Sequence, residues 1–102
     1  MIRTVVLINA KSGRRDELIA AFQANAPTVR AEKGCIEYAA FVDATGIGPY
    51  QAKLGPDSYM ILEAWEGPEA LNAHVATPHM IAYGQKTKDL IASRAVHVVT
   101  AV

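Results

Sequence analysis

The sequence has very little cysteine and no excess of charge of either sign. Its single cysteine, Cys35, has no partner for an internal disulfide, which favours a reducing compartment such as the cytoplasm. Ten basic residues balance ten acidic ones, so no net field draws the chain to nucleic acid or to an anionic membrane surface. We therefore expect a cytoplasmic protein that binds neither nucleic acid nor membrane.

Long hydrophobic runs are also missing. The apolar stretch near the N-terminus breaks at Asn9 and Lys11, and is too short for a signal peptide or a membrane span. Apolar residues nevertheless make up 51% of the 102 residues, which is enough for one ordinary core. Since no repeat, linker or low-complexity segment divides the chain, residues 1–102 are expected to form a single domain.

What the sequence does contain is a regular succession of apolar segments and turn signals. Proline favours the first position of a helix, so Pro68 and Pro78 each mark a helix start. The pattern predicts strands over residues 4–10, 35–43, 59–65 and 95–102, and helices over 14–33, 69–75 and 78–92. This β-α-β-β-α-β order is the ferredoxin-like plan of the α+β class, in which helices cover one face of an antiparallel sheet.

The first and last strands are apolar on both sides. Val5 to Ile8 has no polar residue, and Val96 to Val99 has only His97. Helices of one chain cover only one face of such a sheet, so the other face needs a second cover. A second copy of the chain is the simplest one, and we predict a homodimer with the sheets face to face.

The connection over residues 44–58 is dense in glycine and proline and is long for a hairpin. Residues 50–54 within it have the composition of a short extra strand. Three interpretations stay open for this loop: a mobile hairpin, a lid over a site, or an arm that contacts a partner.

Two side chains at the end of the third predicted strand are candidates for a chemical role. Glu63 and Trp65 are two residues apart, and therefore lie on the same face. If helices cover that face, Glu63 is either a buried carboxylate with a structural hydrogen bond or an acid or base of raised pKa. Trp65 is either a large core residue or an aromatic wall for a planar ligand.

Two histidines follow on the next predicted helices. His79 precedes Tyr83 by four residues, so the two side chains can touch on one helical face. His74 is expected to be half-buried. Each histidine is either a base for a phenolic proton or a satisfied polar neighbour at a helix start. Their five-residue spacing, interrupted by Pro78, differs from that of a helical zinc pair, so no metal is expected.

Two further residues are candidates for contact with a ligand. Asn9 ends an apolar strand and is either an ordinary strand-end residue or a hydrogen-bond donor to a substrate oxygen. Tyr38 is either a core tyrosine or part of a pocket wall.

The segments GCIEYAAFVD, GPDS and EAWEGPEALNAHVATPHMIAY closely resemble the antibiotic biosynthesis monooxygenase domain family, and in particular its quinol monooxygenases of the YgiN type. The resemblance extends over nearly the whole chain. It implies a dimeric α+β barrel that oxygenates a quinol or another electron-rich aromatic compound with molecular oxygen, without metal, flavin or haem. It also implies that Trp65 lies against the substrate pocket.

Other branches of the same fold offer alternatives. A haem-degrading branch uses an asparagine and a late histidine where this sequence has Val6 and Gly84, which disfavours that activity. Another branch isomerises a small phosphorylated signal molecule and shares the H-x-x-T-P-H pattern, and small barrels of this shape also serve as non-catalytic aromatic-ligand-binding or stress modules. We expect a cofactor-free quinol-type monooxygenase. Its expected catalytic candidates are His74, His79 and Glu63, and its expected substrate contacts are Trp65, Tyr83, Asn9 and Tyr38.

Overall fold

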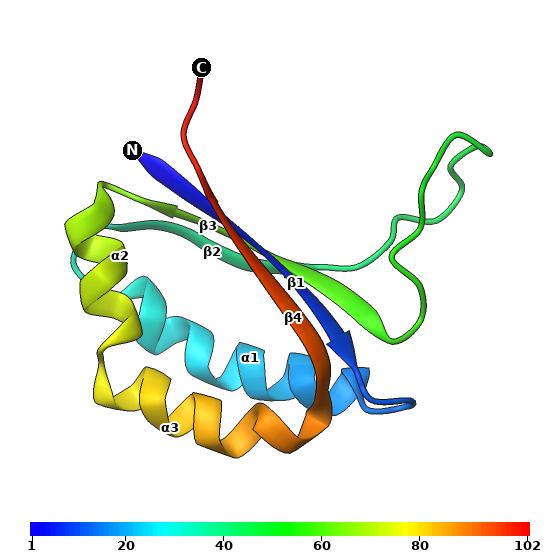
Figure 1. Cartoon of the computed structure of the whole chain (residues 1–102), viewed down its shortest axis with the longest axis horizontal. Coiled ribbons are helices and arrows are strands. Elements are labelled where there is room, and N and C mark those ends of the chain that lie inside the picture. Colours follow the sequence, from blue (N-terminus) through cyan, green and yellow to red (C-terminus); the bar gives the residue numbers. More distant parts are fainter.

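The computed structural model describes all residues from Met1 to Val102. Its elements are β1 (Ile2–Ala10), α1 (Arg15–Arg30), β2 (Cys35–Phe41), β3 (Ser58–Trp65), α2 (Pro68–Val75), α3 (Pro78–Thr87), a 3-10 turn η1 (Lys88–Leu90) and β4 (Ile91–Val99). The strands form one antiparallel sheet in the order β2-β3-β1-β4, with the helices on one side of it (Figure 1). The ferredoxin-like α+β fold is thus confirmed. None of the helices is long and apolar enough to cross a membrane.

The end of α3 differs from the prediction. The helix stops at Thr87 instead of Ala92, and β4 begins at Ile91 instead of Ala95. Leu90 and Ile91 still pack against the core, but they do so from the 3-10 turn and from the first position of the strand. The helical spacing of apolar residues therefore continues past the end of α3 to Leu90 and Ile91. For this reason the sequence pattern predicted a helix that is too long.

Glycine is required where α1 turns into β2. Gly34 has a φ of +85°, a backbone conformation that L side chains rarely adopt. A Cβ atom built on it would also lie 2.6 Å from the Cβ of Ala70 in α2. The helix α1 ends at Arg30, before the predicted stop at Gly34, and Gly34 instead forms the turn into β2 and allows the first turn of α2 to approach closely.

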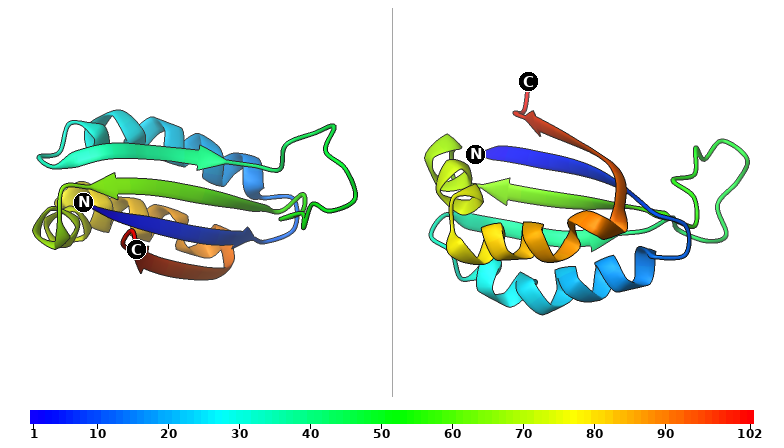
Figure 2. Two further views of the ribbon diagram at one scale, coloured as in Figure 1. Left: turned by 90° about the horizontal axis from the view of Figure 1, so that it is seen from above. Right: turned by 60° about the horizontal axis from the view of Figure 1, so that its bottom comes forward.

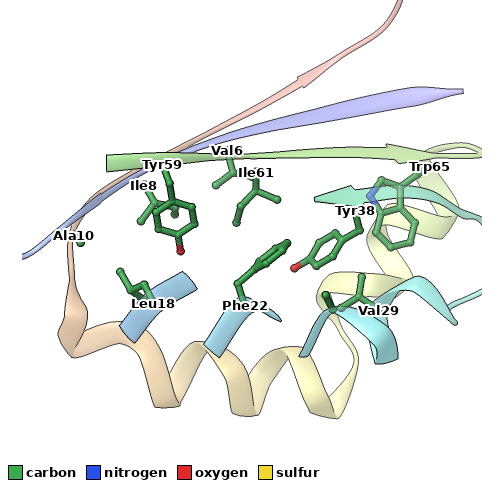
Figure 3. Close-up of a cluster of buried hydrophobic side chains, with 11 residues drawn as sticks. Val6, Ile8, Ala10, Leu18, Phe22, Val29, Tyr38, Tyr59, Ile61 and Trp65 are labelled. Carbon is green, nitrogen blue, oxygen red and sulfur yellow. The ribbon is translucent and has the colours of Figure 1, made fainter. Parts of the chain in front are cut away.

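The sheet has an inner face that packs on the helices. Strand residues on this face alternate with those on the other, and they meet the apolar side of α1 in one cluster (Figure 3). Within it the rings of Phe22 and Tyr38 stack with centroids 4.8 Å apart. The buried cluster consists of Val6, Ile8, Ala10, Leu18, Phe22, Ala26, Val29, Tyr38, Tyr59, Ile61 and Trp65.

The other side, here called the open face, has no helix over it (Figure 2). Its centre on β1 and β3 is apolar, His97 lies in a central row on the edge strand β4, and the other polar residues lie toward the ends of the strands. Phe41 and Val99 on this face are 43% and 46% exposed. By strand alternation and register, the open face carries Arg3, Val5, Leu7, Asn9, Glu37, Ala39, Phe41, Ser58, Met60, Leu62, Ala64, Ser93, Ala95, His97 and Val99.

The loop between β2 and β3 projects beyond the end of the sheet (Figure 1). It contains no strand, so the possible strand over residues 50–54 does not form. The Asp43 carboxylate closes the base of the loop by accepting hydrogen bonds from the backbone N–H groups of Leu54 and Gly55, each at 2.9 Å. These donors hold the pKa of Asp43 below its ordinary value.

Candidate active site

A cavity of about 690 Å³ lies between the inner face of the sheet and helices α2 and α3. Its size and its mainly hydrophobic lining are typical of a small-molecule site. Val96 and Val98 of β4 line it while remaining 50% and 53% exposed, so the cavity opens along this edge strand. The lining contains one acidic residue, Glu63, together with one lysine, Lys88, and one arginine, Arg94.

Glu63 is a buried carboxyl group in the cavity wall. It lies on β3 opposite Thr4 of β1 and Tyr38 of β2. The indole Nε1–H of Trp65 donates to its Oε1 at 2.9 Å, whereas no protein group donates to its Oε2. Burial raises the pKa of Glu63, and the Trp65 hydrogen bond only partly opposes this effect. The side chain can therefore exchange a proton with a bound molecule.

His74, on α2, is buried in the same wall with only 2% of its surface exposed. Its Nδ1 lies 2.9 Å from Oε2 of Glu32. An ionised carboxylate only accepts hydrogen bonds, so Nδ1 is the donor in this contact, and Nε2 is the ring nitrogen without a protein partner. The imidazole ring packs on Trp65 at a centroid distance of 4.6 Å and meets Tyr38 edge-on at 5.7 Å. Packing on two sides thus fixes the ring.

His79 meets the same carboxylate from α3. Its Nε2 lies 3.0 Å from Oε2 of Glu32 and 3.3 Å from Oγ1 of Thr77, the N-cap residue of α3. Its polar partners are therefore Glu32 and Thr77, not Tyr83 as the helical spacing suggested. His79 does not line the cavity, and it reaches the site only through Glu32.

Sequence reasoning did not identify Glu32, although one signal pointed to it. An acidic residue just after the C-terminus of a helix faces the negative end of the helix dipole, which is unfavourable without a cationic or hydrogen-bonding partner. Glu32 occupies this position after α1. Its partners lie 42 and 47 residues further along the chain, and no local pattern indicates them.

Thr4 is a second residue that the pattern did not reveal. It lines the cavity on β1 and is 3% exposed, but its Oγ1 has no hydrogen-bond partner. The available signal was a polar residue at an inward position of an apolar strand. An enclosed hydroxyl without a partner costs stability, so this position is not optimised for folding.

The structure brings four of the seven predicted site residues to the cavity: Glu63, His74, Tyr38 and Tyr83. Burial raises the pKa of both tyrosines, which keeps their hydroxyl groups protonated near neutral pH. Trp65 lies behind the wall, fully buried, where it contacts Glu63 and His74. It orients site residues without lining the cavity itself.

Asn9 lies elsewhere. It is on the open face at the end of β1, where its Nδ2 donates to Oγ of Ser93 at 2.8 Å and its Oδ1 accepts from Oγ of Ser58. The side chain therefore joins three strand ends. The structure does not bring Asn9 together with the cavity residues.

Comparison with known sequences places the chain in a family. Residues 1–86 match the family model described as antibiotic biosynthesis monooxygenase. The Escherichia coli (strain K12) protein named "Probable quinol monooxygenase YgiN" is 36% identical over 90 residues, a match that covers 86% of each chain. The uncharacterized protein sll1783 of Synechocystis is 31% identical over 88 residues, covering 86% of this chain and 54% of that protein. The chain belongs to the antibiotic biosynthesis monooxygenase family.

Solved structures agree on the fold. A protein from Nitrosomonas europaea superposes with a TM-score of 0.84 at 18% identity, covering 100% of this chain and 99% of that one. Rv0793 from Mycobacterium tuberculosis superposes with a TM-score of 0.80 at 22% identity, covering 99% of this chain and 94% of that one. At these identities the comparison supports the architecture of the chain alone.

Proposed function

We propose that the protein is a cofactor-independent monooxygenase that oxidises a quinol or a related electron-rich aromatic compound with molecular oxygen. The observation that carries this proposal is the wall of the cavity. There the imidazole of His74, held through its Nδ1 by Glu32, and the buried carboxyl of Glu63 line the same mainly apolar cavity. The likeness to a protein named as a quinol monooxygenase supports the same reaction.

The reaction balances without an external reductant. A quinol loses two hydrogen atoms and gains one oxygen atom to become a hydroxyquinone. Molecular oxygen supplies that atom, and its second atom leaves as water with the two hydrogens. All the electrons that reduce oxygen come from the substrate, so the protein needs only to deprotonate and orient it and to exclude bulk water.

In this scheme His74 is the general base. Its Nε2 accepts the phenolic proton, and the negative charge of Glu32 stabilises the imidazolium that forms. The quinolate then transfers electrons to oxygen. The protonated form of Glu63, favoured by its raised pKa, donates a hydrogen bond or a proton to an oxygen atom that becomes negative.

The remaining residues position these groups. The hydroxyls of Tyr38 and Tyr83 provide hydrogen-bond donors along the cavity, and Trp65 holds Glu63 in place through its indole N–H. His79 acts through Glu32 and contributes to its orientation.

The test uses chelator-treated protein and a reduced naphthoquinol. Oxygen uptake and quinone formation above a protein-free control are expected, because quinols also oxidise unaided. Oxygen-18 from labelled gas should appear in the quinone product, which separates an oxygenase from an oxidase. A rate equal to the control would overturn the proposal. Tight aromatic binding without turnover would then favour the non-catalytic module, and conversion of a phosphorylated sugar-like compound would favour the isomerase.

We further propose that two copies associate through their open faces. The support is the apolar centre of that face, where Val5, Leu7, Met60 and Leu62 lie side by side without a helix over them. Sedimentation at micromolar concentration should show a dimer, and a monomer would contradict the proposal. The free, half-buried Cys35 supports a cytoplasmic location.

A further inference from the structure

The cavity has two polar ends that are separated by an apolar middle. The sheet register defines this order, because residues directly opposite each other on neighbouring strands share a row across the inner face. The first row contains Tyr38, Glu63, Thr4 and Val98. The middle row contains Ala40, Ile61, Val6 and Val96, and the third contains Tyr59, Ile8 and Arg94.

The separation of the two ends limits the shape of a ligand that contacts both. Thr4 and Ile8 mark the first and third rows on β1. At about 3.3 Å per residue, four residues of strand span roughly 13 Å. A single aromatic ring with its substituents is too short for this span, whereas two fused rings with a polar group at each end approach it. The apolar middle row suits the flat hydrocarbon part of such a molecule.

The third-row end of the cavity carries positive charge without a counter-ion. Arg94 and Lys88 both line the cavity and both are exposed at its mouth. Neither forms an ion pair, since the salt bridges of the chain join Arg14 to Glu17 and the two histidines to Glu32. The acidic residue of the lining, Glu63, belongs to the first row.

Two tyrosines connect the cations to the interior of the cavity. Tyr59 belongs to the third row, and Tyr83 of α3 also lines the cavity. Burial raises the pKa of Tyr83, and a hydrogen bond with Tyr59 and the positive charge of Arg94 partly oppose that rise. An anionic group placed there would meet two cations and phenolic O–H donors.

We infer that the substrate is a fused-ring aromatic acid, with a carboxylate held by Arg94 and Lys88 and its reacting hydroxyl at the opposite end, beside Glu63 and His74. The position of the reacting hydroxyl beside Glu63 and His74 rests on the proposed function, whereas the position of the carboxylate does not. A charge-assisted contact in a partly open site raises the affinity for the ligand roughly tenfold, which corresponds to about 1.4 kcal/mol of binding free energy.

The experiment measures equilibrium binding and needs no turnover. One ligand is a hydroxynaphthoate whose hydroxyl and carboxylate are at opposite ends of the fused rings. The other is the naphthol that lacks the carboxylate. The wild-type protein should bind the acid about tenfold more tightly than the naphthol, and this preference should shrink as salt screens the charges. Equal binding of the two ligands would overturn the inference.

Variants then locate the preference. Arg94→Gln and Lys88→Gln should each reduce it, and the double variant should bind both ligands equally. Lys86→Gln, which removes the same charge from an α3 residue outside the cavity, should leave the preference intact. A preference that survives the double variant would contradict the inference even if the wild type shows it.

The binding measurement tests the inference, and the oxygen-uptake measurement tests the proposed function, so each can be contradicted without the other. If the wild type prefers the acid but consumes no oxygen with any quinol, the inference stands and the monooxygenase proposal falls. If it oxidises quinols but binds the acid no better than the naphthol, only the inference is overturned.

Discussion

The two faces of the one sheet differ in where they place polar residues. Both are built from the same strands and from similar apolar side chains. On the inner face, Thr4 and Glu63 interrupt the apolar rows next to a cavity, and neither is fully satisfied by the protein. On the open face, Arg3 and Asn9 lie toward the ends of β1, and the centre formed by β1 and β3 is apolar.

This difference indicates separate purposes for the two faces. Enclosing a polar group without a partner lowers stability, so the position of two such groups beside one cavity supports the proposal of a ligand site there. An apolar centre with a polar border is instead the composition of a surface that another macromolecule covers. The inner face is thus suited to chemistry and the open face to association.

The largest effect is expected from the inner face. His74→Gln keeps a polar side chain of similar length but removes the base, so turnover should fall by about 100-fold or more. Affinity for the substrate should change by less than about threefold. Steady-state oxygen uptake and equilibrium binding measure the two quantities. His97→Gln on the open face is the matched control and should retain turnover. Equal losses in turnover and affinity would show that His74 serves packing instead.

A charge on the open face should act on association and leave the fold intact. Leu62→Lys places an ammonium group at the centre of the proposed interface, where burial without a partner costs several kcal/mol. The dimer dissociation constant should therefore rise by about 100-fold, as measured by sedimentation over a concentration series. Ile81→Lys adds the same charge on exposed α3 and should not affect it. Unchanged association of the Leu62 variant would place the interface elsewhere.

The buried carboxyl predicts a pH dependence of stability. The folded pKa of Glu63 lies above its ordinary value of 4.5, so the folded chain binds more protons than the unfolded one in that window. The free energy of unfolding should therefore fall as pH rises from 4.5 through the folded pKa, by about 1.4 kcal/mol for each pH unit between the two pKa values. Glu63→Gln should reduce this fall in urea titrations at several pH values. A variant with the wild-type slope would assign the dependence to other groups.

The smallest effect concerns the enclosed hydroxyl. Thr4→Val keeps the shape of the side chain and removes an oxygen that has no partner, so the free energy of unfolding should stay equal or rise by about 1 kcal/mol. The reverse change on the open face, Val5→Thr, should lower it by no more than about 0.5 kcal/mol in the monomer. Thermal unfolding measures both. Clear destabilisation by Thr4→Val would mean that the hydroxyl has a structural partner in solution.

Much of the fold follows from the sequence because strand and helix periods are local properties. The two-residue spacing of Glu63 and Trp65 correctly placed both on the buried face. The convergence of His74 and His79 on Glu32 depends instead on how three helices dock, and spacing along one helix cannot reveal it. Asn9 shows the same limit, since strand alternation decides which face it occupies, and only the assembled sheet shows which face the helices cover.

The position of Trp65 has a consequence for observing the protein. It is the only tryptophan in the chain, it is fully buried, and its indole contacts both Glu63 and His74. Its fluorescence therefore comes from a single place, one residue away from the cavity. Protonation of the neighbouring imidazole quenches indole emission, and a bound quinone absorbs the emitted light. The single buried tryptophan thus offers a label-free optical test of the proposed proton transfer and of ligand occupancy.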